Sequence, residues 1–115
     1  MTARIAHFDI TAPDDAALID FYAGLFDWSV DRKGPGYTLL QPADGPGGAI
    51  VEAPEARVVL GVTVDDLEAA VRRVTELGGT VQMPPTDNGW VTKALVTDPS
   101  GNPLSLIQAQ RPAGR

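Results

Sequence analysis

Residues 58–108 decide the fold of this chain, and they read VVLGVTVDDLEAAVRRVTELGGTVQMPPTDNGWVTKALVTDPSGNPLSLIQ. The earlier stretch HFDITAPDDAALIDFYAGLFDWSV, residues 7–30, aligns with residues 59–81 when the first copy is allowed one extra residue. Further along the alignment, Gly48 meets Gly101. Because self-similarity within a chain marks a duplicated structural unit, the sequence predicts two copies of one folding unit.

Each copy predicts a strand, a helix and three further strands. Alternation of apolar and polar residues indicates the strands, and apolar residues three and four positions apart indicate the helices. The first helix carries one apolar stripe that we expect to face a core, formed by Leu18, Phe21, Tyr22, Leu25 and Phe26. The predicted strands are 5–11, 28–30, 37–41, 48–53, 58–64, 80–83, 90–97 and 104–108, and the helices are 14–26 and 65–77.

The helix ends carry recognisable signals. Asp14 and Asp15 lie at the start of the first helix, where negative charge is favoured. Asp65 followed by Glu68 resembles a capping box and predicts Asp65 as the cap of the second helix. The Gly78-Gly79 pair, residues 78–79, predicts the end of that helix.

Composition narrows the class of protein. The chain has 115 residues, no cysteine, one histidine and a formal net charge of −6. Its length predicts a single domain, residues 1–115, with repeat one at 4–53, repeat two at 58–109 and a tail at 110–115. The acidic balance argues against nucleic-acid or membrane-surface partners, and the short apolar runs argue against a membrane span. We therefore expect a cytoplasmic protein.

The two βαβββ units, with FYAGLFDW in the first and DPSGNPLSLIQ in the second, resemble the vicinal oxygen chelate superfamily. This superfamily includes glyoxalase I, extradiol dioxygenases, methylmalonyl-CoA epimerase and the fosfomycin- and bleomycin-resistance proteins. The resemblance implies an α+β fold in which eight strands form an open half-barrel with the helices packed outside. It also implies a ligand on the concave face and a homodimer. The sequence leaves open whether the units pair within one chain or swap between two.

The resemblance also indicates where a metal would bind. Metal-dependent members place a histidine on the first strand of a unit and a glutamate on its last strand. Here His7 and Glu52 match these positions, and the repeat aligns them with Val59 and Ser105. Because a catalytic metal normally needs three protein ligands, we expect no metal cofactor, and if an ion binds, its ligands are His7 and Glu52.

Other residues extend the predicted site. Asp9 shares the polar side of the first strand with His7. Tyr37 and Trp90 each follow a glycine-containing loop in the alignment, and they are either rim packing or an aromatic clamp on a flat ligand. Trp28 is interpreted as a core residue, and the direction of Lys93 stays open. The predicted ligand-binding set is His7, Asp9, Tyr37, Glu52, Val59, Trp90 and Ser105.

We therefore predict a protein that binds a small organic molecule, a drug or a metabolite, without a metal. An acidic groove with aromatic walls would suit a cationic, planar ligand. The alternative is a lyase or isomerase of the same superfamily, with His7 and Glu52 as the catalytic acid–base pair and, in one version, as ligands of a divalent metal. His7 also has a plainer interpretation as a hydrogen-bonded polar residue that lines the groove. The identity of the ligand and the existence of turnover do not follow from the sequence.

Overall fold

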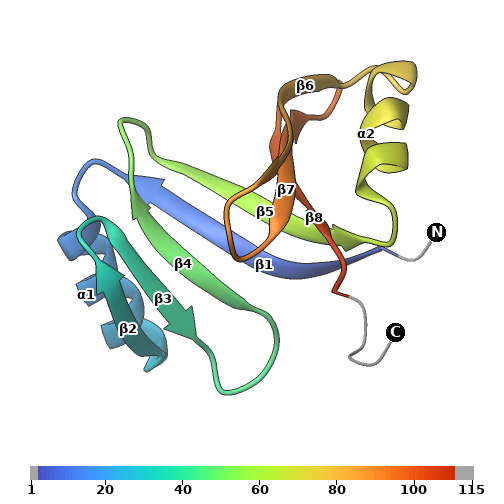
Figure 1. Ribbon diagram of the computed structural model, residues 1–115. Helices are drawn as coiled ribbons and strands as arrows, with labels where there is room; N and C mark the ends of the chain where they lie inside the picture. Colours follow the sequence, from blue (N-terminus) through green and yellow to red (C-terminus); the bar gives the residue numbers. More distant parts are fainter. Residues whose placement is uncertain (1–2, 111–115) are drawn as a thin grey trace. The chain divides into compact units, whose positions relative to one another are not determined.

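The computed structural model describes residues 3–110, which form eight strands and two helices of the expected α+β class (Figure 1). The chain divides into two compact units. The first unit comprises residues 6–59, and the second comprises residues 60–110 together with residues 3–5. In chain order the elements are β1 (Ala3–Ala12), α1 (Asp15–Phe26), β2 (Ser29–Gly34), β3 (Tyr37–Gln41), β4 (Gly47–Glu52), β5 (Arg57–Val64), α2 (Leu67–Glu76), β6 (Thr80–Asp87), β7 (Thr92–Thr97) and β8 (Pro103–Gln108).

The first unit is a four-stranded sheet in the order β2-β3-β4-β1. Strand β1 runs parallel to β4, and β3 runs antiparallel to both β2 and β4. Helix α1 connects β1 to β2 and covers one face of this sheet (Figure 1). Leu40 and Ile50 are almost fully buried on that face. Leu40 pairs with Gly48, and Ile50 pairs with the equally buried Thr38.

An aromatic cluster joins α1 to the sheet. The ring of Trp28 lies 6.0 Å from that of Phe8, 6.3 Å from that of Tyr22 and 4.8 Å from that of Phe26, measured between centroids. Gly48 of β4 lies directly beneath Phe8, and a Cβ atom at this position would stand 2.4 Å from the ring. Trp28, interpreted from the sequence as a core residue, is thus half-buried and packed against the rings of this cluster.

The apolar stripe of α1 is less buried than its periodicity predicts. No residue of this helix is buried, and Phe21, Leu25 and Phe26 are 57%, 60% and 49% exposed. Helical periodicity reports which side chains share a face, but it does not report how much neighbouring structure covers that face. The expectation that the whole stripe faces a core is wrong for these three residues.

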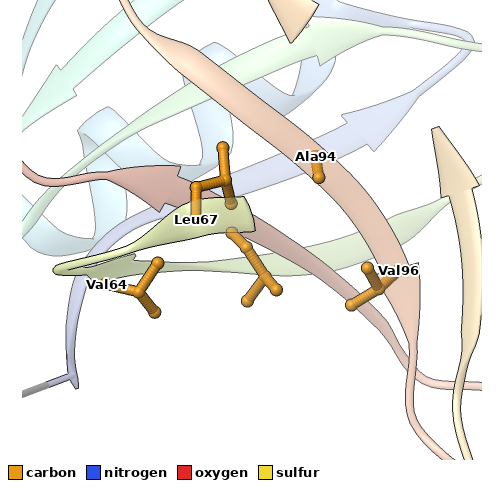
Figure 2. Packing of buried hydrophobic residues seen from close by; sticks show 5 residues of the cluster. Val64, Leu67, Ala94 and Val96 are labelled. Carbon is orange, nitrogen blue, oxygen red and sulfur yellow. The ribbon is translucent and has the colours of Figure 1, made fainter. Parts of the chain in front are cut away.

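The second unit repeats the arrangement with the sheet order β5-β8-β7-β6. Strand β5 runs parallel to β8, and β7 runs antiparallel to β8 and β6. Helix α2 packs against β6, β7 and β8. The core of this unit lies between helix and sheet, and Figure 2 labels four of its buried side chains, Val64, Leu67, Ala94 and Val96. Leu106 belongs to the same cluster.

Equivalent aspartates cap the two helices. The Asp14 carboxylate accepts a hydrogen bond from the backbone N–H of Ala17, and the Asp66 carboxylate accepts one from Ala69, each at 3.1 Å. The prediction of Asp65 as the cap of α2 is wrong by one residue, because the helix starts at Leu67.

Two strands continue four residues past their predicted ends. Strand β2 continues to Gly34 through residues expected in a turn, and β6 continues to Asp87 through Pro84 and Pro85. Strand β6 ends its sheet and pairs only with β7 there, and proline is tolerated at such an edge because one row of N–H groups needs no partner. Within residues 3–110, no helix is long and apolar enough to span a membrane.

Candidate functional site

Three predicted site residues of the first unit share one face of its sheet. In the register of β1 with β4, His7 lies beside Gly47 and Asp9 beside Ala49. Tyr37 of β3 pairs with Val51 of β4. Because side chains alternate between faces along a strand, His7, Asp9 and Tyr37 all lie on the face opposite α1. We call this face of the first unit the His7 face.

His7 and Asp9 form a direct polar contact. The distance between His7 Nε2 and Asp9 Oδ1 is 3.0 Å, which is the length of a good hydrogen bond. The two side chains are 29% and 19% exposed, so water reaches both groups only in part. The pair is therefore in direct contact and still partly accessible from the surface.

Tyr37 completes the polar cluster of this face. Burial raises the pKa of its phenol above the ordinary value of 10.0, and the negative charge of Asp9 raises it further. Both causes disfavour the phenolate, so the phenol stays neutral and can donate a hydrogen bond.

Glu52 lies on the other side of the sheet. It pairs with Ala12, and in the alternation of β1 this position belongs with Phe8 rather than with His7. Its backbone N–H donates to the carbonyl of Gly36 at 2.9 Å, and its side chain extends over the same glycine. The structure does not bring Glu52 to His7.

The repeat alignment also needs correction at the last strand of each unit. Ala53 donates its N–H to the carbonyl of Ala12, and Ala109 donates its N–H to the carbonyl of Val64. These two bonds occupy the same place in each unit, so the residue before each donor is equivalent: Glu52 corresponds to Gln108 and not to Ser105.

Ser105 has a different counterpart in the first unit. It lies beside Gly61 on β5, as Ala49 lies beside Asp9 on β1, so Ser105 corresponds to Ala49. Ser105 is only 2% exposed, and Val59 is half-buried on β5. Gln108 does not belong to this set, because its side-chain amide bonds the N–H of Leu67 and the carbonyl of Asp65.

Lys93 is the residue that sequence reasoning left unassigned. It pairs with Ile107 in β7–β8 as Tyr37 pairs with Val51 in β3–β4, so Lys93 occupies the position of Tyr37. It alternates with the buried Ala94 and therefore lies on the face opposite α2. A single charge inside an apolar strand was the available signal, but without the register its direction could not be read.

Trp90 is not the structural equivalent of Tyr37. It lies in the loop between β6 and β7, where the side chain of Asn88 accepts the N–H groups of Trp90 and Val91 at 3.0 Å each. Its residue exposure is 76%. Trp90 borders a hollow of about 540 Å³ in the second unit, whose lining includes Asp65, Asp66 and Asp87 but none of His7, Asp9, Tyr37, Glu52 or Val59.

The donor set does not suit a divalent metal. With the corrected alignment, the four expected ligand positions carry His7, Glu52, Val59 and Gln108. Glu52 lies on the other face of the sheet from His7, valine cannot bind a metal, and the Gln108 amide is bonded to the backbone of Leu67 and Asp65. The His7 Nε2 atom is already bonded to Asp9. Across residues 3–110, no group of three or more His, Asp or Glu side chains is placed to hold an ion.

The fold and this polar sheet face define a class of protein: a glyoxalase-like domain built from two βαβββ units. A family model described as a glyoxalase-like domain matches residues 6–107, and the chain belongs to that family. The fold is shared with a glyoxalase/bleomycin resistance protein/dioxygenase superfamily member from Vibrio splendidus, with a TM-score of 0.72 and 18% identity. That match covers 94% of this chain and 100% of the other.

Two relatives with recognisable sequence similarity are considerably longer. A protein named putative glyoxylase CFP32, from Mycobacterium bovis, is 32% identical over 92% of this chain and 46% of its own length. A protein named anthracycline biosynthesis protein DnrV, from Streptomyces peucetius, is 33% identical over 84% of this chain and 43% of its own length. This chain therefore spans less than half the length of these relatives.

Proposed function

We propose that this chain binds a small organic molecule, a metabolite or a drug, on the His7 face and that binding requires no metal. The observation that carries the proposal is the placement of His7, Asp9 and Tyr37 together on one sheet face, with the imidazole and carboxylate 3.0 Å apart. A few convergent polar groups on a partly apolar surface are what small-molecule sites generally present.

The corresponding positions support the metal-free half of the proposal. Val59 offers no ligand atom, Glu52 lies on the other face of the sheet from His7, and the Gln108 amide already bonds Leu67 and Asp65. Metal binding would therefore depend on His7, the adjacent Asp9 carboxylate and water, which is fewer than the three protein ligands that a catalytic metal normally has. The similarity to a protein named for anthracycline biosynthesis supports an aromatic metabolite as the ligand class.

Thermal denaturation of tag-free protein dialysed against EDTA, screened against planar aromatic metabolites, tests this proposal. A ligand present at about 100 times its Kd should stabilise the fold by roughly 2.7 kcal/mol, with or without added metal. Substitution of His7 by alanine should weaken binding roughly three- to tenfold, the value of one or two hydrogen bonds. Glu52→Gln is the matched control, because Glu52 lies on the other face.

Elemental analysis provides the complementary measurement. We expect well under one divalent ion per chain in protein purified without a histidine tag. Stoichiometric zinc, manganese, nickel or iron, or a ligand whose stabilising effect disappears with EDTA, would contradict the proposal.

An enzyme of the lyase or isomerase kind is the second candidate. The 3.0 Å contact favours it, because a carboxylate that orients an imidazole is a common arrangement for a general base. The carboxylate partner would then be Asp9, whereas the sequence pointed to Glu52. If His7→Ala leaves ligand affinity unchanged but abolishes turnover of an identified substrate, the enzyme is the correct assignment and a purely binding role is refuted.

We also propose a homodimer that uses the exposed apolar face of α1. Phe21, Leu25 and Phe26 are each about half exposed, and many members of the superfamily that the sequence resembles are homodimers. Phe21→Glu should convert the dimer to a monomer in sedimentation velocity. Leu77→Glu, at a position 64% exposed beyond α2, is the matched control and should leave the dimer intact. A wild-type monomer at all accessible concentrations would refute this proposal.

A further inference from the structure

We infer that Asp9 is a positioning residue that holds the His7 imidazole in one tautomer, with the proton on Nε2 and Nδ1 free to accept a hydrogen bond from the ligand. This inference deepens the proposed function, because it states which ligand group His7 recognises. It makes Asp9 the carboxylate partner of His7, whereas the sequence prediction paired His7 with Glu52 as catalytic acid and base.

The direction of the hydrogen bond follows from the chemistry of the two groups. An ionised carboxylate oxygen can only accept, so the bond between Asp9 Oδ1 and His7 Nε2 requires a proton on Nε2. In a neutral imidazole only one nitrogen carries a proton, and Nδ1 then holds a lone pair. The bond partner of one ring nitrogen thus decides the state of the other.

The backbone fixes the geometry of this pair. His7 and Asp9 are two residues apart on β1, so their side chains project from the same face of a strand that is hydrogen-bonded along β4. Gly47 and Ala49, their neighbours on β4, carry no side chain or only a methyl group. Asp9 is also the more enclosed of the two side chains, at 19% exposure against 29%.

The tautomer determines the class of ligand group at His7. A hydroxyl or N–H of the ligand can donate to Nδ1, whereas a carbonyl or carboxylate oxygen would face a lone pair and be repelled. The Asp9 charge adds to that repulsion for an anionic group. We therefore expect the ligand to present a phenolic or alcoholic hydroxyl, or an N–H group, at His7.

The chain offers a direct spectroscopic test because His7 is its only histidine. Long-range ¹H–¹⁵N spectra should be recorded on the full-length protein at pH 9, well above the ordinary imidazole pKa of about 6.5. In the wild type, the two ring nitrogens should resonate as a single Nε2–H tautomer. In Asp9→Ala, they should move toward the average of two exchanging tautomers, while Glu52→Ala should match the wild type.

The control spectra separate positioning from a general loss of structure. A backbone amide spectrum that stays dispersed shows that Asp9→Ala remains folded. A wild-type spectrum with the proton on Nδ1, or nitrogen shifts that change in Glu52→Ala and not in Asp9→Ala, would overturn the assignment of Asp9. None of these measurements needs a ligand, so their outcome is independent of whether the proposed function is correct.

A matched pair of probes tests the ligand class. Phenol and anisole are planar molecules that differ in a hydroxyl donor, and each should be titrated while the His7 ring resonances are followed. Phenol should bind roughly three- to tenfold more tightly than anisole, as one hydrogen bond contributes, and Asp9→Ala should narrow that ratio. If phenol and anisole change the His7 ring resonances equally, or if neither changes them, the prediction that a ligand hydroxyl donates a hydrogen bond to His7 Nδ1 is refuted.

Discussion

Gly48 offers the sharpest test of how the sheet beneath the His7 face is packed. A Cβ atom added there would stand 2.4, 2.5 and 2.6 Å from three ring atoms of Phe8, whereas ordinary contact begins at 3.4 Å. The ring must therefore withdraw by about 1 Å, the difference between 3.4 and 2.4 Å, within a cluster that Trp28 fills. Overpacking of this kind costs about 1–3 kcal/mol. Gly48→Ala should lower the free energy of unfolding by that amount relative to its control.

The control is the neighbouring glycine of the same strand. A Cβ on Gly47 would meet only the carbonyl oxygen of Leu40, at an ordinary distance of 3.5 Å. Both substitutions reduce the entropy of the unfolded chain by the same amount, about 0.4–1 kcal/mol, so this term cancels in the comparison. In thermal unfolding, Gly48→Ala should melt roughly 4–12 °C below Gly47→Ala, at about 4 °C per kcal/mol.

A double substitution identifies the atoms responsible. Phe8→Leu gives the new methyl group room, so combining it with Gly48→Ala should recover most of the steric cost, as a double-mutant cycle would measure. If Gly48→Ala is as stable as Gly47→Ala, or if the cycle shows no coupling to Phe8, the close approach of ring and backbone described above is refuted.

Three further predictions follow from single groups. The pKa of Tyr37 is raised in the folded state, so its contribution to stability is complete below pH 10.0 and is lost as pH rises through the folded pKa. Absorbance titration should show that Asp9→Asn lowers the pKa of Tyr37. The pKa should not reach the ordinary value, because burial is the larger cause of the shift. Hydrogen bonds from the Asn102 side chain and backbone lower the pKa of Asp98, so the stabilisation by Asp98 is present above pH 3.8 and is lost as pH falls through the folded pKa. In Asp98→Ala, the loss of stability with falling pH should therefore be less steep. An acid-unfolding curve identical to that of the wild type would contradict this. The Thr38 hydroxyl is buried and has no hydrogen-bond partner among residues 3–110. Thr38→Val should therefore raise the free energy of unfolding by roughly 1 kcal/mol in urea denaturation. A loss of stability would show that the hydroxyl does have a hydrogen-bond partner.

Much of the fold could be predicted because local rules act strongly on this chain. Periodicity and turn residues located both helices and all eight strands, and β3 matches its predicted bounds. The errors fall where local signals are neutral: β6 runs through Pro84 and Pro85 because an edge strand tolerates them. The exposure of Phe21 and Leu25 depends on how much structure covers α1, which no local pattern encodes.

The candidate site was harder to predict, because it depends on register. Alternation along β1 correctly indicated that His7 and Asp9 share a face, but it did not show that the two are hydrogen-bonded. Glu52 was assigned by its distance along the chain from Gly48, but in the structure its side chain lies on the opposite face of the sheet from His7. A shift of one residue in a strand moves a side chain to the opposite face, so small alignment errors become errors of chemistry.

The sequence by itself determined that two βαβββ units exist, that His7 is the single histidine, and that a valine, Val59, stands at the position equivalent to His7 in the second unit. Those conclusions depend on residue identity and short-range periodicity, which can be read directly from the sequence. Only the tertiary structure decided that Asp9 is the partner of His7, that Ala49 is the counterpart of Ser105, and that Lys93 takes the place of Tyr37. The physical reason is that hydrogen bonding between strands sets which residues meet, and strands distant in sequence can pair in several registers with similar local preferences.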